Sequence, residues 1–175
     1  ITERTLVTLK DGEKEVHSDP DHDLLKIAVI NRYNPEVKPS VGFVSGFGIR
    51  QGALASSIAH DSHNVVCVGV SDRHIAETVQ WIFSNRGGIA VHDGNSVRGL
   101  PLPIAGLMTG DPVEITGERY LELTRIAGSL GSSLQAPFMT LSFMALLVIP
   151  SLKIGDRGLF DVDAFSFTPL FEQHV

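Results

Sequence analysis

Residues 52–70, GALASSIAHDSHNVVCVGV, contain two apolar segments separated by five polar residues. The first segment, residues 52–59, consists almost wholly of small side chains, which indicates close approach of the backbone by a packed helix or by a ligand. The second, from Val65 to Val70, is apolar at every position, which is typical of a strand covered on both faces. We therefore expect two apolar strands joined by the loop His60-Asp61-Ser62-His63-Asn64.

Further strands and helices are predicted on both sides of this stretch. Strands are predicted over residues 2–10, 25–33 and 41–46, and a hairpin over 89–100 with its turn at Asp93-Gly94-Asn95. A helix is predicted from an N-cap at Ser71 or Asp72 to about Asn85, with Phe83 on its apolar side, and Gly87-Gly88 ends it. A second helix is predicted over residues 111–130, with Pro112 as the first helical residue and Leu121 on its apolar side. Residues 137–147 fit a helix or a strand, and residues 152–175 fit loops with short extended pieces.

Together these segments predict one α+β domain spanning residues 1–175. Its mainly antiparallel sheet has five to seven strands, with Val65 to Val70 central, and two to four helices cover it. The 175 residues suffice for a sizeable core, and 43% hydrophobic and 19% charged residues argue against disorder.

The charge and hydropathy of the chain argue against nucleic acid and membranes as partners. The net charge is −6 and Lys and Arg form no cluster, so nucleic acid is not an expected partner. The longest apolar stretch, Phe143 to Pro150, is far shorter than the roughly 20 residues of a membrane span, so no membrane association is expected.

The single cysteine, Cys67, excludes an internal disulfide framework and any multi-cysteine zinc site. We expect a buried, inert thiol and a reducing, cytoplasmic location, which the lack of a signal-peptide pattern also favours. Because the chain begins with Ile1 and not Met, we expect it to be part of a longer protein.

No complete catalytic motif is present in the sequence. The glycines of residues 46–52 depart from a dinucleotide-binding fingerprint, because the third falls one position late, and they indicate a tight turn instead. The Pro-Cys-x-x-Cys element of cytidine-type zinc deaminases needs two cysteines, which this chain does not have.

The loop His60-Asp61-Ser62-His63-Asn64 leaves three interpretations open. It is a polar turn in which Asp61 and Asn64 bind their own backbone, a loop that faces a ligand or an interface, or a metal site. A Ser-His-Asp triad within five consecutive residues is sterically excluded, because adjacent side chains cannot form the proton relay.

Several blocks of the chain closely resemble the C-terminal domain of bacterial adenine deaminases. The most specific are Ala59-His60-Asp61-Ser62-His63-Asn64 and Pro101-Leu102-Pro103-Ile104-Ala105-Gly106-Leu107-Met108. Further blocks are residues 41–48, 137–143 and 148–153, so the resemblance covers most of the chain. That family belongs to the amidohydrolase superfamily, whose members hold divalent metal ions in a separate (β/α)8 barrel.

The resemblance implies that this chain lies downstream of a barrel that converts adenine and water to hypoxanthine and ammonia. The barrel's manganese, iron or zinc would activate the water, and no metal site is expected in this chain. His60, Asp61, Ser62, His63 and Asn64 are then expected near the barrel mouth, with His60 or His63 facing the purine and Asp61 orienting one imidazole. The implied partners are adenine, the N-terminal barrel and further copies in a homo-oligomer.

Two other functions remain open from the residues themselves. The domain could serve only to stabilise the barrel or an oligomer, without touching substrate. It could also be a separate purine-binding module that has the same fold.

Overall fold

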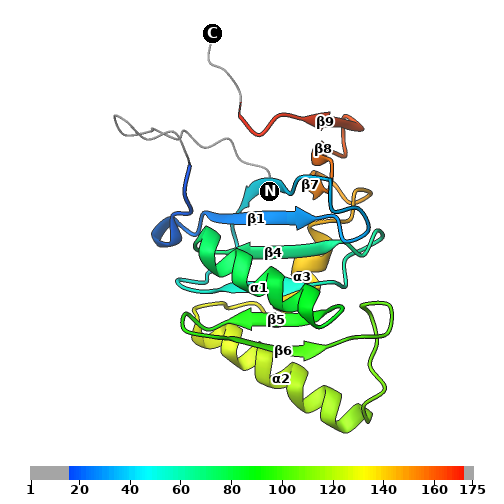
Figure 1. The fold of residues 1–175 in the computed structure, drawn as a ribbon. Helices are drawn as coiled ribbons and strands as arrows, with labels where there is room; N and C mark the ends of the chain where they lie inside the picture. Colours follow the sequence, from blue (N-terminus) through cyan, green and yellow to red (C-terminus); the bar gives the residue numbers. More distant parts are fainter. Residues whose placement is uncertain (1–15, 172–175) are drawn as a thin grey trace.

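The computed structural model describes residues 16–171. Its main sheet has six antiparallel strands in the order β2-β1-β4-β3-β5-β6 (Figure 1). These strands are β1 (Leu25–Ile30), β2 (Ser40–Val44), β3 (Ala53–Ser56), β4 (Val65–Gly69), β5 (Gly88–His92) and β6 (Val97–Pro101). Strand β4 pairs with β1 on one edge and β3 on the other, so its predicted central position is confirmed.

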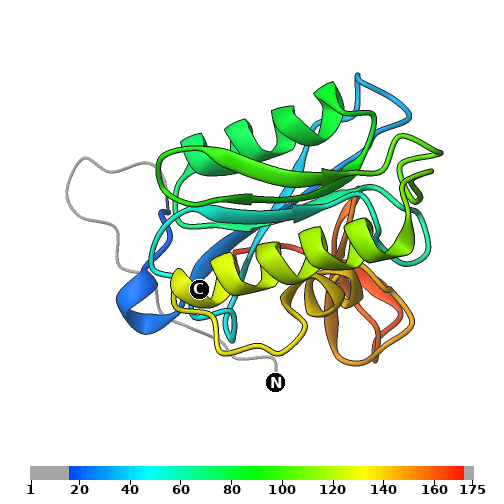
Figure 2. The ribbon, with the colours of Figure 1, turned by 90° about the horizontal axis from the view of Figure 1, so that it is seen from below.

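Helices cover both faces of the main sheet. Helix α1 (Asp72–Ser84) lies on one face, and α2 (Val113–Ser129) and α3 (Pro137–Phe143) lie on the other (Figure 2). A short 3-10 helix, Pro20–His22, precedes β1. The predicted α+β class with a mainly antiparallel sheet is confirmed, and residues 137–147, which fitted a helix or a strand, begin with a helix.

The C-terminal segment forms a second antiparallel sheet beside β2. Its strands are β7 (Leu152–Gly155), β8 (Gly158–Asp161) and β9 (Ser166–Thr168), paired in that order. The sequence indicated only short extended pieces here, because strands of three or four residues are too short to show a clear alternation.

Side chains of different size face the two sides of the main sheet, because successive residues of a strand point in opposite directions. The α1 face is lined by small residues, including Ala28, Ala53, Ala55 and Ala90, together with Cys67, which is fully buried as predicted. The opposite face has larger side chains, which pack against α2 and α3. Among these are Leu54, Val66, Val68, Leu123, Phe138 and Leu141.

The small side chains of β3 are explained by helix α1, which packs directly on this strand. Two glycines of the sheet show how closely the helix approaches. A Cβ atom at Gly69 would lie 2.7 Å from Ile75, and one at Gly99 would lie 2.3 Å from the ring of Trp81. The packed helix, one of the two alternatives that the sequence left open, occupies this surface.

Helix α1 has a side-chain N-cap, and it ends in a backbone motif with a left-handed residue. Ser71 accepts a hydrogen bond from the backbone N–H of His74. At the C-terminus, Arg86 N–H donates to Phe83 O and Gly87 N–H donates to Ile82 O, which is a Schellman motif. The left-handed position of this motif belongs to Arg86, with φ 60°, and not to a glycine.

Three details of the predicted helices are wrong. Phe83 and Leu121, expected on apolar faces, are 42% and 54% exposed. Phe83 follows the buried Ile82, and one residue turns a helix by about 100°, which carries the next side chain off the core face. Pro112 is the N-cap of α2 and not its first helical residue.

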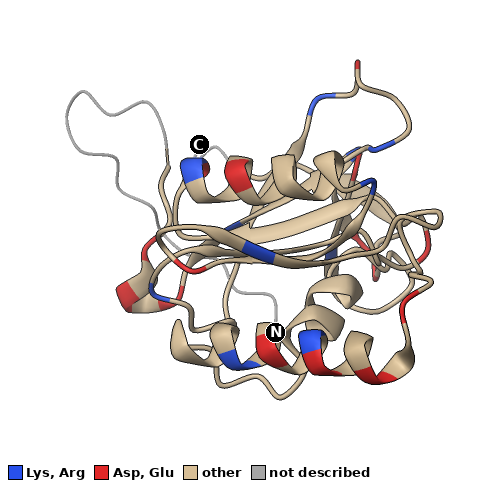
Figure 3. Cartoon of the chain, turned by 60° about the horizontal axis from the view of Figure 1, so that its bottom comes forward, with Lys and Arg blue, Asp and Glu red and all other residues tan. Residues whose placement is uncertain are grey.

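The predicted strand over residues 2–10 lies outside the described residues. Charged side chains lie mainly on helices and loops, and both signs occur along α2 (Figure 3). Within residues 16–171, no helix is both long and apolar enough to cross a membrane.

Candidate functional site

The predicted site residues lie in the loop that joins β3 to β4, residues 57–64, which we call the 57–64 loop. It lies at the end of the sheet toward which the β1 arrow points in Figure 1, beside the segment that follows β1. The segment that follows β6 also approaches this end, because Ser57 Oγ donates to Gly106 O at 2.6 Å. Segments far apart in the sequence thus meet around the loop.

Hydrogen bonds at both ends of the loop hold it in place. Ser57, fully buried, accepts at Oγ from Gly88 N–H at 2.8 Å. Asn64, 2% exposed, accepts at Oδ1 from the backbone N–H of Arg32 at 3.3 Å. Between them, Tyr33 Oη donates to Ser62 O at 2.9 Å. Asn64 therefore helps to hold the loop through its Oδ1 atom.

The two histidines of the loop have different environments. The His60 ring packs against Phe143, at the end of α3, with 5.1 Å between the ring centroids. His63 adopts the left-handed conformation, with φ 50°, and its backbone N–H donates to Ala59 O at 2.7 Å. Its Nδ1 atom is buried and has no hydrogen-bond partner within residues 16–171. A buried polar atom without a partner is costly, so His63 has unused capacity for a hydrogen bond.

Asp61 and Ser62 are exposed at the tip of the loop. The hydrogen bonds of the loop within residues 16–171 do not include one between Asp61 and either imidazole. Asp61 is exposed to solvent in this structure, and its expected role in orienting a histidine of the assembled enzyme stays a prediction.

A metal site is not supported by the described part of the chain. Within residues 16–171, no three side chains of His, Cys, Asp or Glu lie close enough together to hold a metal ion.

A pocket of about 400 Å³ opens beside the loop, on the α1 face of the sheet. Its floor includes the buried residues Val65 and Ile82, and its walls include Phe83. Arg32 and Arg86 are both among its lining residues. Sequence reasoning did not detect this pocket, because residues 32, 65 and 86 come together only through strand pairing and helix packing.

Apart from the loop and the pocket, a pair of polar side chains, His92 and Glu77, joins β5 to α1. Gly94 N–H donates to His92 Nδ1 at 3.0 Å, so the ring proton is on Nε2, which donates to Glu77 Oε2 at 2.6 Å. This hydrogen bond lowers the pKa of Glu77. Both ring nitrogens of His92 are satisfied and its side chain is 1% exposed, so His92 holds α1 against β5.

Comparison with known proteins gives a consistent result over nearly the whole chain. The sequence model of the adenine deaminase C-terminal domain family matches residues 1–166. The chain is 52% identical to an adenine deaminase of Salinibacter ruber (strain DSM 13855 / M31) over 172 residues, 97% of this chain and 31% of that protein. It is 47% identical to the Methanosarcina mazei adenine deaminase and 43% identical to that of Borreliella afzelii (strain PKo), and covers 31% of each.

The chain thus spans less than a third of the length of these relatives, while they match 97%, 98% and 95% of its own length. The match includes the whole 57–64 loop and the residues that hold it. By this similarity the chain belongs to the adenine deaminase C-terminal domain family.

Proposed function

We propose that this chain is the C-terminal domain of an adenine deaminase, an enzyme that converts adenine and water to hypoxanthine and ammonia. The remaining two thirds of such an enzyme would hold the catalytic barrel and its divalent metal, which activates the water. In this proposal the domain packs on the barrel and supports the purine site with the 57–64 loop, and the assembled enzyme is a cytoplasmic homo-oligomer.

The observation that carries the proposed role of the loop is the state of His63. Its Nδ1 is buried without a partner within residues 16–171, although every other side chain of the loop is either satisfied, packed or exposed to solvent. A partner from the adjoining domain or from the purine would satisfy this nitrogen. The exposed Asp61 and Ser62 lie next to it and would meet the same surface.

The experiment uses a chimera, in which this chain replaces the matching C-terminal third of the Salinibacter ruber adenine deaminase. We expect His63→Ala to lower kcat/KM for adenine by about tenfold, the effect of losing one well-placed hydrogen bond. Asp61→Ala is expected to lower it less, because Asp61 is exposed and has no bond to the imidazole. Ammonia release at varied adenine concentrations measures both.

His22→Ala and Asp21→Ala provide the matched control, because they lie in an exposed 3-10 helix that precedes β1, at the opposite end of that strand from the loop. These variants should keep the parental kcat and KM. If His63→Ala and Asp61→Ala also keep them while only the melting temperature falls, the loop is structural and the alternative of a purely stabilising domain holds. Adenine binding by the 175-residue chain alone would instead support the separate purine-binding module.

A further inference from the structure

We propose that the pocket between the ends of α1 and β1 binds a small organic phosphate, with Arg32 and Arg86 binding the phosphate and an apolar ring lying against Ile82 and Phe83. The pocket lies on the α1 face of the sheet, whereas His60 packs against α3 on the opposite face. Ser57, the first residue of the 57–64 loop, also lines the pocket, but the proposal does not depend on the role of residues 60–64.

The charge of the pocket favours an anion with more than one negative charge. Two guanidinium groups line it, and none of its lining residues is acidic. Within residues 16–171 neither pocket arginine forms an ion pair with a carboxylate, so no acidic side chain of the described residues neutralises this charge. A phosphate monoester carries about −1.5 to −2 charges near neutral pH, which matches two guanidinium groups. Guanidinium also presents its N–H donors in a geometry that suits phosphate oxygens.

Arg32 is already held in position without a ligand. Its Nη2 donates to Ala105 O at 2.6 Å and to Tyr33 Oη at 3.2 Å, and the guanidinium lies 5.0 Å from the centre of the Tyr33 ring. Its Nε is buried and has no hydrogen-bond partner within residues 16–171. A positioned cation with an unused buried donor is well suited to bind an anion, because little side-chain freedom is lost on binding.

Gly106, in the segment that follows β6, leaves space for the Arg32 side chain. A Cβ atom at Gly106 would overlap Arg32 Nη1, with only 1.8 Å between them. Any other residue at this position would push the guanidinium away from its place. The absence of a side chain at Gly106 thus permits the observed position of Arg32.

Arg86 occupies a backbone position that ordinarily belongs to glycine. It is the left-handed residue of the Schellman motif that ends α1, with φ 60°. Glycine adopts this conformation without steric cost, whereas a residue with a Cβ atom does not. An exposed arginine at such a position is explained if its side chain has a use, and its inclusion in the pocket wall supplies one.

The floor of the pocket indicates that the ligand has an apolar part. Val65 and Ile82 are each 1% exposed and form this floor, while Phe83, 42% exposed, stands at its side. Inorganic phosphate would leave the exposed Phe83 ring uncovered, but a planar ring would contact it above the buried floor. The volume of about 400 Å³ falls in the range typical of small-molecule pockets.

Phenyl phosphate is the probe that tests the proposal, measured by calorimetric titration of the 175-residue chain at low salt. We expect it to bind more tightly than benzoate, which has one negative charge, and than inorganic phosphate, which has no ring. Benzyl alcohol, which has a ring and no charge, should show no binding. Absence of phenyl phosphate binding at millimolar concentration would overturn the proposal.

Arg86→Gly separates binding from folding. The substitution removes one cation of the pocket and places glycine at the left-handed position, so the affinity for phenyl phosphate should fall at least tenfold while the melting temperature stays the same or rises. Arg86→Lys should retain part of the affinity. An unchanged affinity in Arg86→Gly would show that the probe binds elsewhere, and the proposal would fail.

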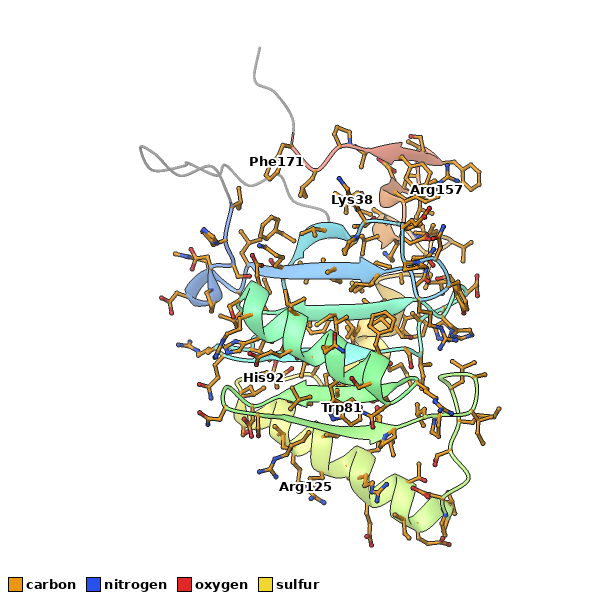
Figure 4. All side chains as sticks on the ribbon, in the orientation of Figure 1. Lys38, Trp81, His92, Arg125, Arg157 and Phe171 are labelled. Atoms are coloured by element: carbon orange, nitrogen blue, oxygen red, sulfur yellow. The ribbon has the colours of Figure 1, made fainter. Side chains whose placement is uncertain are left out.

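Arg86→Gln and Arg125→Gln together test whether a loss of affinity comes from the pocket or only from the change in net charge. Arg125 is exposed on α2, on the other side of the sheet (Figure 4). Both variants lose one positive charge, but only Arg86→Gln should weaken binding by tenfold or more. An equal loss of affinity in Arg125→Gln would mean that the pocket has no part in binding.

Discussion

His74, in the first turn of α1, links protonation to folding stability. Its ring centroid lies 4.4 Å from that of His92. Burial lowers the pKa of His74 from its usual 6.5, the nearby His92 and Arg73 lower this pKa further, and Glu77 opposes them. Below pH 6.5 the unfolded chain therefore binds more protons at this residue than the folded chain does. The free energy of unfolding must then fall as pH is lowered through 6.5 toward the folded pKa.

We predict that His74→Gln loses less stability than the parent between about pH 7.5 and about pH 5.5, because it lacks the histidine that resists protonation. Urea denaturation at both pH values measures this. His22 serves as the opposite control, since its hydrogen bond to Asp19 raises its pKa and gives stability that is lost as pH rises. His22→Gln should therefore lose more stability than the parent on acidification. Equal losses in the parent and in His74→Gln would contradict the prediction.

At the scale of elements, the contact of α1 with the sheet depends on glycine. The ring of Trp81 lies where a side chain of residue 99, on strand β6, would be. A Cβ atom there would lie 2.3 to 2.6 Å from three ring atoms of Trp81, so the helix or the ring must move to admit it. The small-residue surface on this face extends from β1 to β6 and accounts for the close approach of α1.

We predict that Gly99→Ala lowers the free energy of unfolding by about 1–3 kcal/mol, the usual cost of overpacking a well-packed contact. Gly117→Ala is the matched control, because a Cβ atom there meets nothing within 4 Å. Gly117 lies inside α2, where alanine is favoured over glycine by about 1 kcal/mol, so this variant should gain stability. Chemical denaturation with Trp81 fluorescence follows both, and a neutral Gly99→Ala would show that the helix is not closely packed.

At the scale of the whole molecule, the chain has the cores of a folded domain but spans less than a third of the length of its relatives. We predict that the purified 175-residue chain unfolds cooperatively and does not release ammonia from adenine. The reason is that the side chains within residues 16–171 do not assemble a metal-binding cluster. Ammonia release above that of a heat-inactivated control would contradict this prediction.

Much of the architecture could be predicted because its signals are local. The apolar run Val65 to Val70, the N-cap Ser71 and the Asp93-Gly94 turn each indicate one element, and the structure has a central strand, a helix and a hairpin at these places. The loop between β3 and β4 was also predictable as a candidate site, because five polar residues between two apolar strands stand out in the sequence.

The sequence by itself thus determined the fold class, the central strand and the position of the polar loop, since periodicity, caps and turns act over a few neighbouring residues. Only the tertiary structure decided that α1 covers the small residues of β3 and that His63 keeps an unpartnered nitrogen. It alone also placed Arg32 and Arg86 in the lining of one pocket. The physical reason is that these arrangements depend on which strands pair and which side chains meet across the core, and such contacts join residues that are far apart in the chain.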